Sequence, residues 1–309
     1  MTEITWIFAD GRECRSETEP VRLALYRDAD SPADGLELEF AGTALLQESP
    51  CGVRIQKDGT LIFEGIVDTH TVDAQRGMRT ETLVCRSLAA RLLDNEAAPG
   101  LLNRPSVRVM EKLFLQPFGL RVSDNGTRAA AGRLSVERGT RCWTVLCRFA
   151  ERFLHTGVYC TRGGAVVFGQ RPQKEITLTE ILRIRTVHNP YARISCAVVQ
   201  NARTGAFDAV YENNAAAGVQ RVRYFSSETA SLAGKEIADG EKAAFSAEVT
   251  CTGYVDAGPG DTVRLPDAEE ALQVVGVRFV RSAEKEETTL SLARCTDGKE
   301  NKNVEFQTN

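Results

Sequence analysis

The chain has 309 residues, of which 42% are hydrophobic and 26% charged, an ordinary composition for a folded protein of two or three domains. Its formal net charge is −4 with both signs interspersed, so no basic footprint for tight or sequence-specific binding to nucleic acid is present. We expect no integral membrane segment, because no run approaches ~18 apolar residues. We also expect no signal peptide, because residues 1–10 lack basic and apolar regions.

Residues 1–96 are predicted to form a β-barrel-like domain. Strands are expected at residues 4–8, 21–26 and 36–40, where apolar and polar side chains alternate with period two. A hairpin over residues 51–66 turns at Asp58-Gly59, a pair that tolerates positive φ. A second hairpin runs from residue 66 to Cys85 through a polar turn at residues 75–77. Ser87 is then expected to cap a short helix that Pro99 cannot continue.

Residues 97–175 are predicted to form a small α+β domain. One helix is expected to begin at Pro105 and to end at Pro117 and Gly119. A second helix is expected over residues 143–154, with an apolar face that includes Trp143 and Phe153. Short strands at residues 120–122 and 133–136, a polar segment at 123–132 and a hairpin over 158–168 complete the domain.

Residues 176–295 are predicted to form a second β-barrel-like domain, followed by a polar, unstructured tail at 296–309. Strand patterns occur near residues 194–198, 207–211, 222–224, 245–251, 274–279 and 288–293. A polar insertion at residues 226–242 has partly helical character. The expected fold is therefore mainly β with an α+β insert, in which two β-barrel-like tube domains flank a small α+β domain.

Nine cysteines, an odd number in a chain without a secretion signal, predict reduced thiols rather than a disulfide framework. Four residues, Cys142, Cys147, His155 and Cys160, have the side-chain types of a zinc site. However, Cys142 and Cys147 are five apart across a helix start, which places them on different faces, and no C-x-x-C occurs. Buried thiols are the favoured interpretation, and the sequence leaves metal binding by these four residues open.

No residue pattern indicates catalysis. Asp68, His70 and Asp73 resemble a metal or proton-relay set, but Asp73 falls near a turn, where acidic residues are common. Two pairs of neighbouring carboxylates lie in helix-end and turn contexts rather than in a cleft: Asp94 with Glu96, and Glu286 with Glu287. The sequence contains no G-x-S-x-G, Walker or G-x-G-x-x-G motif. We therefore assign no catalytic, cofactor-binding or metal-binding residue and expect no cofactor and no enzyme activity.

Aromatic side chains lie on the apolar helix faces of the middle domain: Phe114, Phe118, Trp143, Phe149 and Phe153. They are consistent with a domain core and also with an obligate subunit interface, which resembles a core cut in half. The sequence does not separate these two uses.

Three ordered motifs in residues 61–120 and one near the C-terminus resemble the baseplate hub proteins of contractile phage tails. The first three are "F-x-G-x-V/I-D" ending at Asp68, "C-R-S-L" starting at Cys85 and "L-x-x-x-P-F-G-L" starting at Leu113. The fourth is a glycine-flanked "G-D-x-V" at residues 260–263, followed by "L-x-V-x-x-V-x-F-x-x-S" from Leu272 to Ser282. Mu-type hubs and late-control-D-like tail proteins of prophages and tail-like bacteriocins share this order. The resemblance covers most of the chain, and the middle domain matches only in pattern.

This resemblance implies a structural protein: a homotrimeric ring in which two similar domains per chain give six modules around one axis. Such a hub joins the tail tube, or a tube-initiator protein, to the central spike, and it can contact the tape-measure protein. It belongs to the virion tail baseplate and is assembled in the host cytoplasm. The alternatives are another tail component such as a distal tail protein, and a tail-associated cell-wall hydrolase or carbohydrate-binding module.

Overall fold

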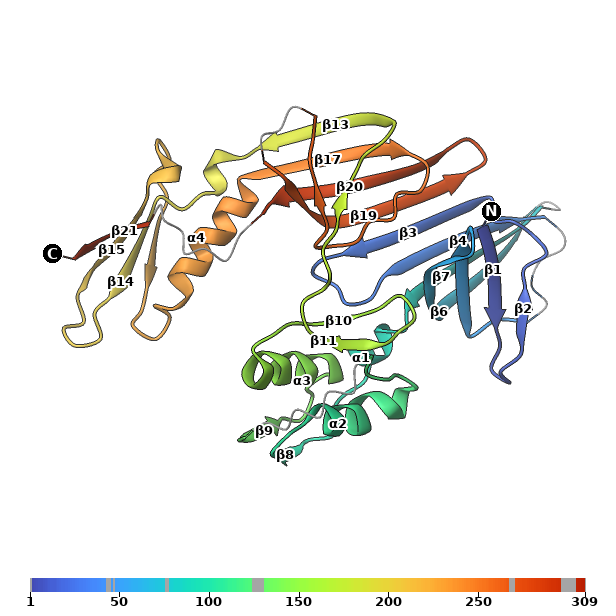
Figure 1. The fold of residues 1–309 in the computed structure, drawn as a ribbon, viewed down its shortest axis with the longest axis horizontal. Helices are drawn as coiled ribbons and strands as arrows, with labels where there is room; N and C mark the ends of the chain where they lie inside the picture. Colours follow the sequence, from blue (N-terminus) through green and yellow to red (C-terminus); the bar gives the residue numbers. More distant parts are fainter. Residues whose placement is uncertain are drawn as a thin grey trace. The chain divides into compact units, whose positions relative to one another are not determined.

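The computed structural model describes residues 2–42, 46, 48–75, 78–123, 131–266 and 270–295, together with the backbone of 304–308. The chain is mainly β, as the sequence predicts, and separates into two compact units (Figure 1). Unit 1 comprises Met1–Gln173, Gly253–Gly260 and Gly276–Thr288. Unit 2 comprises Lys174–Thr252, Asp261–Val275 and Thr289–Asn309.

The main sheet of unit 1 has the strand order β19-β3-β4-β7-β6-β5-β1-β2, and all these neighbours are antiparallel. The bounds are β1 Thr2–Ile7, β2 Glu13–Arg15, β3 Arg22–Asp28, β4 Gly35–Ala41, β5 Gly52–Lys57, β6 Thr60–Gln75, β7 Met78–Ser87 and β19 Leu272–Ser282. Strands β1 and β3 to β7 match the predicted ones, whereas the three-residue β2 was not predicted.

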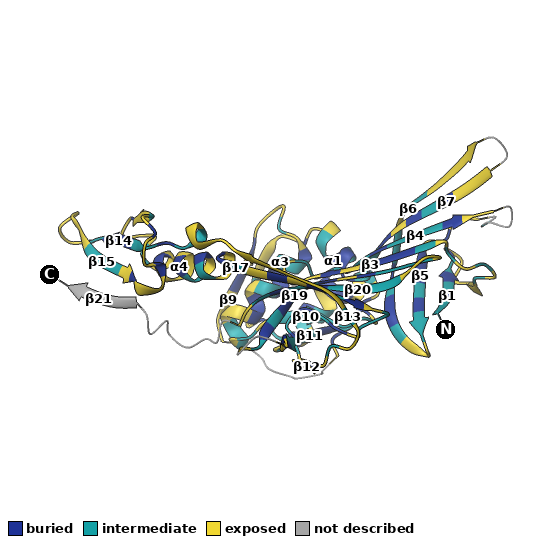
Figure 2. Cartoon of the chain, turned by 90° about the horizontal axis from the view of Figure 1, so that it is seen from above, coloured by how far each residue is buried: buried dark blue, intermediate teal, exposed yellow. Residues whose placement is uncertain are grey.

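Alternation places one face of this sheet in a core that includes Trp6, Leu38, Ile55 and Phe279, each at most 2% exposed. The tight turn between β5 and β6 has positive φ at Asp58 (50°) and at the following glycine (77°), as the Asp-Gly pair predicts. The distal ends of β6 and β7 project beyond the rest of the sheet, with most side chains exposed (Figure 2).

The predicted barrels are corrected by the strand order. Within the described residues the strands follow an open path that does not return to its first member, so the sheets are not closed barrels. Closing a sheet requires hydrogen bonds between its two outermost strands, and period-two alternation is the same in open and closed sheets. The mainly β character was therefore predictable from the sequence, but whether the sheets are open or closed was not.

The middle part of unit 1 combines helices with short strands. It contains α1 Ala90–Asp94, β8 Gly100–Asn103, α2 Val107–Met110, β9 Arg133–Val136, α3 Cys142–Phe149, β10 Val158–Cys160 and β11 Val166–Phe168. A π-helical turn, Glu111–Leu115, extends α2, and a second one, Ala150–Leu154, extends α3. A 3-10 turn, Gln116–Phe118, follows the first of these and ends at Gly119, whose φ is 73°, where the sequence places the helix end.

Two local predictions in this region are wrong. Ser87 is the last residue of β7 and caps no helix; α1 begins after Ala89 instead. Pro105 is not the first helical residue, because the Ser106 hydroxyl caps α2 by accepting a hydrogen bond from the Val109 amide at 3.3 Å. The strand β8, which pairs with β9, was not predicted.

The predicted domain boundaries also differ from the compact units. Residues 1–96 and 97–173 fall in the same unit, which also takes residues 253–260 and 276–288 from the predicted C-terminal domain. Long-range strand pairing explains the difference, since β19 joins the N-terminal sheet by pairing with β3. In this pairing Phe279 lies opposite Leu25. The sequence pattern of a strand does not specify such a distant partner.

Unit 2 contains two sheets. In the first, β13 Ile181–His188, β17 Phe245–Thr252, β20 Glu286–Arg294 and β19 lie in that order, and β18 Thr262–Val263 bridges β19 and β12 Glu175–Ile176. In the second, the order is β16 Val222–Phe225, β14 Cys196–Gln200, β15 Phe207–Asn213 and β21 Val304–Thr308. Helix α4, Leu232–Ala243, packs against the second sheet through Ala233 and Ile237.

The C-terminal segment departs from the expected unstructured tail, because β21 pairs antiparallel with β15. Residues 296–303 of that predicted tail, and 124–130 of the predicted polar segment, lie outside the described residues. None of the helices in the described ranges is both long and apolar enough to cross a membrane.

Candidate functional site

A buried arginine organises a polar site of unit 1. Arg27 is 4% exposed, and its guanidinium donates hydrogen bonds to the carbonyl oxygens of Ile62 (2.8 Å) and Ala257 (2.9 Å). Its Nε also donates to the carboxylate of Asp34 at 3.3 Å. Arg27 therefore connects β3 to β6 and to the loop at residues 253–260.

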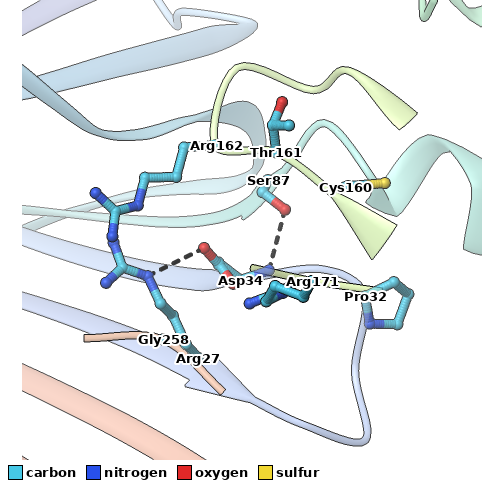
Figure 3. A pocket seen from close by; sticks show the side chains of 9 residues that line it. All are labelled: Arg27, Pro32, Asp34, Ser87, Cys160, Thr161, Arg162, Arg171 and Gly258. Carbon is cyan, nitrogen blue, oxygen red and sulfur yellow. Dashed lines mark hydrogen bonds and ion pairs between the residues drawn. The ribbon is translucent and has the colours of Figure 1, made fainter. Parts of the chain in front are cut away.

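Ser87 fixes the position of Asp34. The Asp34 amide donates to the Ser87 hydroxyl at 3.0 Å, and the Ser87 amide donates back to the Asp34 carbonyl at 2.8 Å. This reciprocal pair holds the main chain of Asp34, and the side chain is left facing Arg27 (Figure 3).

These residues line a pocket of about 50 Å³, here called the arginine pocket, which is shown in Figure 3. Its lining residues are Arg27, Pro32, Asp34, Ser87, Cys160, Thr161, Arg162, Arg171 and Gly258. They come from the N-terminal sheet, from the β10–β11 hairpin with the segment after it, and from the loop at residues 253–260. All of them belong to unit 1.

Charge and burial oppose each other in this pocket. Burial raises the pKa of Asp34 above its ordinary value, and this effect outweighs the lowering by Arg27, Arg171 and Arg162. Burial also raises the pKa of the Cys160 thiol to about 12, so this cysteine is a poor nucleophile at neutral pH.

The sequence pattern does not predict the arginine pocket. One signal was present: Arg27 continues the inward series Leu23 and Leu25 at spacing two, so strand alternation alone places it on the core face. Its partners come from remote segments, and nothing in the local sequence indicates them.

The cysteine set does not form a metal centre in the structure. Cys142 is buried, and burial raises the pKa of both Cys142 and Cys147. Among the described residues, no group of three or more His, Cys, Asp or Glu side chains lies close enough to hold a metal ion. His155 ends the second π-helical turn with φ 51°.

The residues Asp68, His70 and Asp73 have separate partners. Asp68 pairs with Arg86 at 2.6 Å, whereas the imidazole Nδ1 of His70 lies 2.9 Å from the Ser49 hydroxyl. Asp73 is exposed on the projecting part of β6. Since each residue has different surroundings, the structure does not bring the three together.

The neighbouring carboxylates form ion pairs. Asp94 pairs with Arg86 at 2.8 Å, Glu286 with Lys57 at 2.6 Å and Glu287 with Lys285 at 2.7 Å, while the backbone of Glu96 bridges to residue 141. The aromatic residues of the middle domain are core: Phe114 and Phe149 are buried, and Phe118, Trp143 and Phe153 pack against them.

One candidate contact surface of unit 2 is the edge strand β13. It pairs with β17 along one side and is the first strand in its sheet, so among the described residues its other side has no partner. Seven of its eight residues are exposed, including Leu182 at 58% and Ile184 at 41%. An exposed apolar edge strand presents unpaired backbone groups to another chain.

Solved structures share this arrangement over almost the whole chain. The 43 kDa tail protein of prophage MuSo2 from Shewanella oneidensis matches with a TM-score of 0.76 and 15% identity, over 95% of this chain and 98% of that one. The chain has the fold of a phage tail protein. A tail protein from Neisseria meningitidis MC58 matches with a TM-score of 0.69 and 18% identity, over 95% and 96% of the two chains.

A component of the E. coli type VI secretion system, described as structurally similar to the bacteriophage T4 tail proteins gp27 and gp5, matches more weakly. The TM-score is 0.54 at 8% identity, over 90% of this chain and 74% of that one. No protein-family model and no curated protein sequence matches the chain. The likeness to tail proteins is therefore one of fold, which the ordered motifs of the sequence indicated.

Proposed function

We propose that this chain is the baseplate hub subunit of a contractile phage tail or phage-derived particle. Three copies form a ring that joins the tail tube, or a tube-initiator protein, to the central spike. The observation that carries the proposal is the match to tail-protein folds over at least 95% of the chain, combined with the ordered hub-like motifs. The role is structural, without catalysis, and the protein resides in the virion tail baseplate after assembly in the host cytoplasm.

The spike partner is supported by the secretion-system neighbours. One of them resembles the T4 tail proteins gp27 and gp5, and two others, with TM-scores of 0.54 and 0.55, come from a Francisella complex that contains VgrG. The tape-measure protein is a further partner that the hub role implies.

The open sheets give this proposal its geometry. Because the described strands of one chain form no closed sheet, a continuous β-lined bore requires strand pairing between subunits. β13 supplies an edge of eight residues for this contact, and its apolar side chains lose water when a neighbouring strand covers them.

Light scattering across a concentration series tests the assembly state, and a mass of three times 33.8 kDa is expected. The double variant Leu182→Lys/Ile184→Lys should shift the protein toward monomer, because lysines on an edge strand oppose pairing. Leu101→Lys, at a side chain that is 53% exposed on β8, is the matched control and should leave the mass unchanged.

The hub role is contradicted if the wild-type chain is a monomer and binds neither the tube protein nor the spike protein. A tail-associated cell-wall hydrolase is tested separately, by the turbidity of purified peptidoglycan. Loss of turbidity with the purified chain would replace the structural proposal by a catalytic one.

A further inference from the structure

The arginine pocket contains one cation whose hydrogen-bonding capacity is unused. The guanidinium of Arg171 stacks over the ring of Tyr159, 5.4 Å from its centroid, and donates no hydrogen bond to any described residue. A guanidinium has five N–H donors. By contrast, Arg27 donates to three acceptors, and Arg162 is ion-paired with Asp256.

The pocket also contains a carboxylate that is short of donors. Within the described part of the chain, the Asp34 carboxylate accepts a single side-chain hydrogen bond, the 3.3 Å contact from Arg27. An ionised carboxylate has about four lone-pair sites. Arg171 is half-buried and has unused donors, and Asp34 has unused lone pairs, in the same small space.

The balance of charge selects a monoanion. Three guanidinium groups line the pocket, and the carboxylates of Asp34 and Asp256 offset two of them, which leaves one positive charge. A volume of about 50 Å³ holds a few water molecules, or one group of about that size.

We propose that the arginine pocket binds a small oxyanion that retains a proton, namely inorganic phosphate or a phosphate monoester. Its unprotonated oxygens accept hydrogen bonds from Arg171, and its P–O–H donates to Asp34. One ligand thus satisfies both groups, which fully deprotonated anions cannot do. Sulfate, acetate and a phosphodiester carry no such proton at neutral pH, so Asp34 repels them.

Bound phosphate would also join segments that are distant in sequence. Asp34 follows β3, and Arg171 follows the β10–β11 hairpin, so the ligand bridges the N-terminal sheet to the α+β domain within unit 1. Since a ligand that binds only the folded chain stabilises it, phosphate should raise the unfolding temperature of unit 1.

Calorimetric titration of the full chain with inorganic phosphate, at about pH 6 in a buffer without phosphate, tests the proposal. Phosphate should bind saturably and at least about tenfold more tightly than sulfate at equal ionic strength, because a site built to accept a proton rejects an analogue without one. Methyl phosphate distinguishes the source: equal binding indicates a monoester, and loss of binding indicates the free ion.

Two variants make the result specific. Arg171→Gln should weaken phosphate binding by about tenfold or more, because it removes a charge-assisted donor, and Arg203→Gln, at an exposed turn of unit 2, should leave it unchanged. Asp34→Asn should abolish the preference for phosphate over sulfate, since an amide can donate to either anion. Absence of saturable phosphate binding, equal affinity for sulfate in the wild type, or undiminished binding by Arg171→Gln would each overturn the proposal.

Discussion

Replacing Arg27 by methionine tests whether burial or the number of ion pairs decides how much an arginine on β3 contributes to the free energy of unfolding. Arg27 is 4% exposed and has one carboxylate partner, at 3.3 Å, in addition to two main-chain carbonyls. Arg22, on the same strand, pairs with two carboxylates at 2.7 and 2.9 Å, but its side chain is 28% exposed. If the number of ion pairs decided the loss of unfolding free energy, replacing Arg22 would cost more. If burial decides it, replacing Arg27 costs more.

We expect Arg27→Met to lower the free energy of unfolding by about 3–5 kcal/mol, because it leaves two carbonyls and a carboxylate without their donor. Arg22→Met should cost about 1 kcal/mol or less, as is usual for partly exposed ion pairs. With a urea m-value of about 2–3 kcal/mol/M, the first change lowers the midpoint by about 1–2 M.

Urea unfolding followed by tryptophan fluorescence is the appropriate assay. Both tryptophans, Trp6 and Trp143, lie in unit 1, so the signal reports the unit that contains Arg27. A midpoint for Arg27→Met at or above that of Arg22→Met would refute the argument that burial determines the cost.

Gly65→Ala should strongly destabilise unit 1, by about 3 kcal/mol or more for overpacking, because a Cβ there would lie 2.2 Å from the Arg86 carbonyl oxygen; an unchanged urea midpoint would contradict this. Alkylation at about pH 8, followed by mass spectrometry, should modify the exposed cysteines first. These are Cys14, Cys51 and Cys295. Cys160 should react later, because its pKa is raised to about 12, and early labelling of Cys160 would show that the pocket is open. Burial raises the pKa of Asp34 above its unfolded value of about 3.9, so protonation favours the folded state and this contribution is lost as pH rises through the raised pKa. The unfolding free energy of the wild type relative to Asp34→Asn should therefore fall from about pH 4 upward. A rise would mean that the pKa of Asp34 is lowered, not raised, in the folded state.

The sequence by itself determined the local elements. Period-two alternation predicted β1 and β3 to β7, the Asp58-Gly59 pair predicted the first hairpin, and Gly119 marked the end of a helix, because each of these depends on neighbouring residues. The motif order also indicated the tail-protein fold that the structural neighbours share.

Only the tertiary structure decided which distant segments meet. In the structure the sheets that were expected to close are open, and β19 pairs with β3. Ser87 is a hydrogen-bond partner of Asp34 rather than a helix cap. Strand partners and buried polar contacts are chosen by the packing of the whole chain, since a strand with a given alternation can pair with many others. The arginine pocket belongs to this class, because its charges come together only after three remote segments have folded against one another.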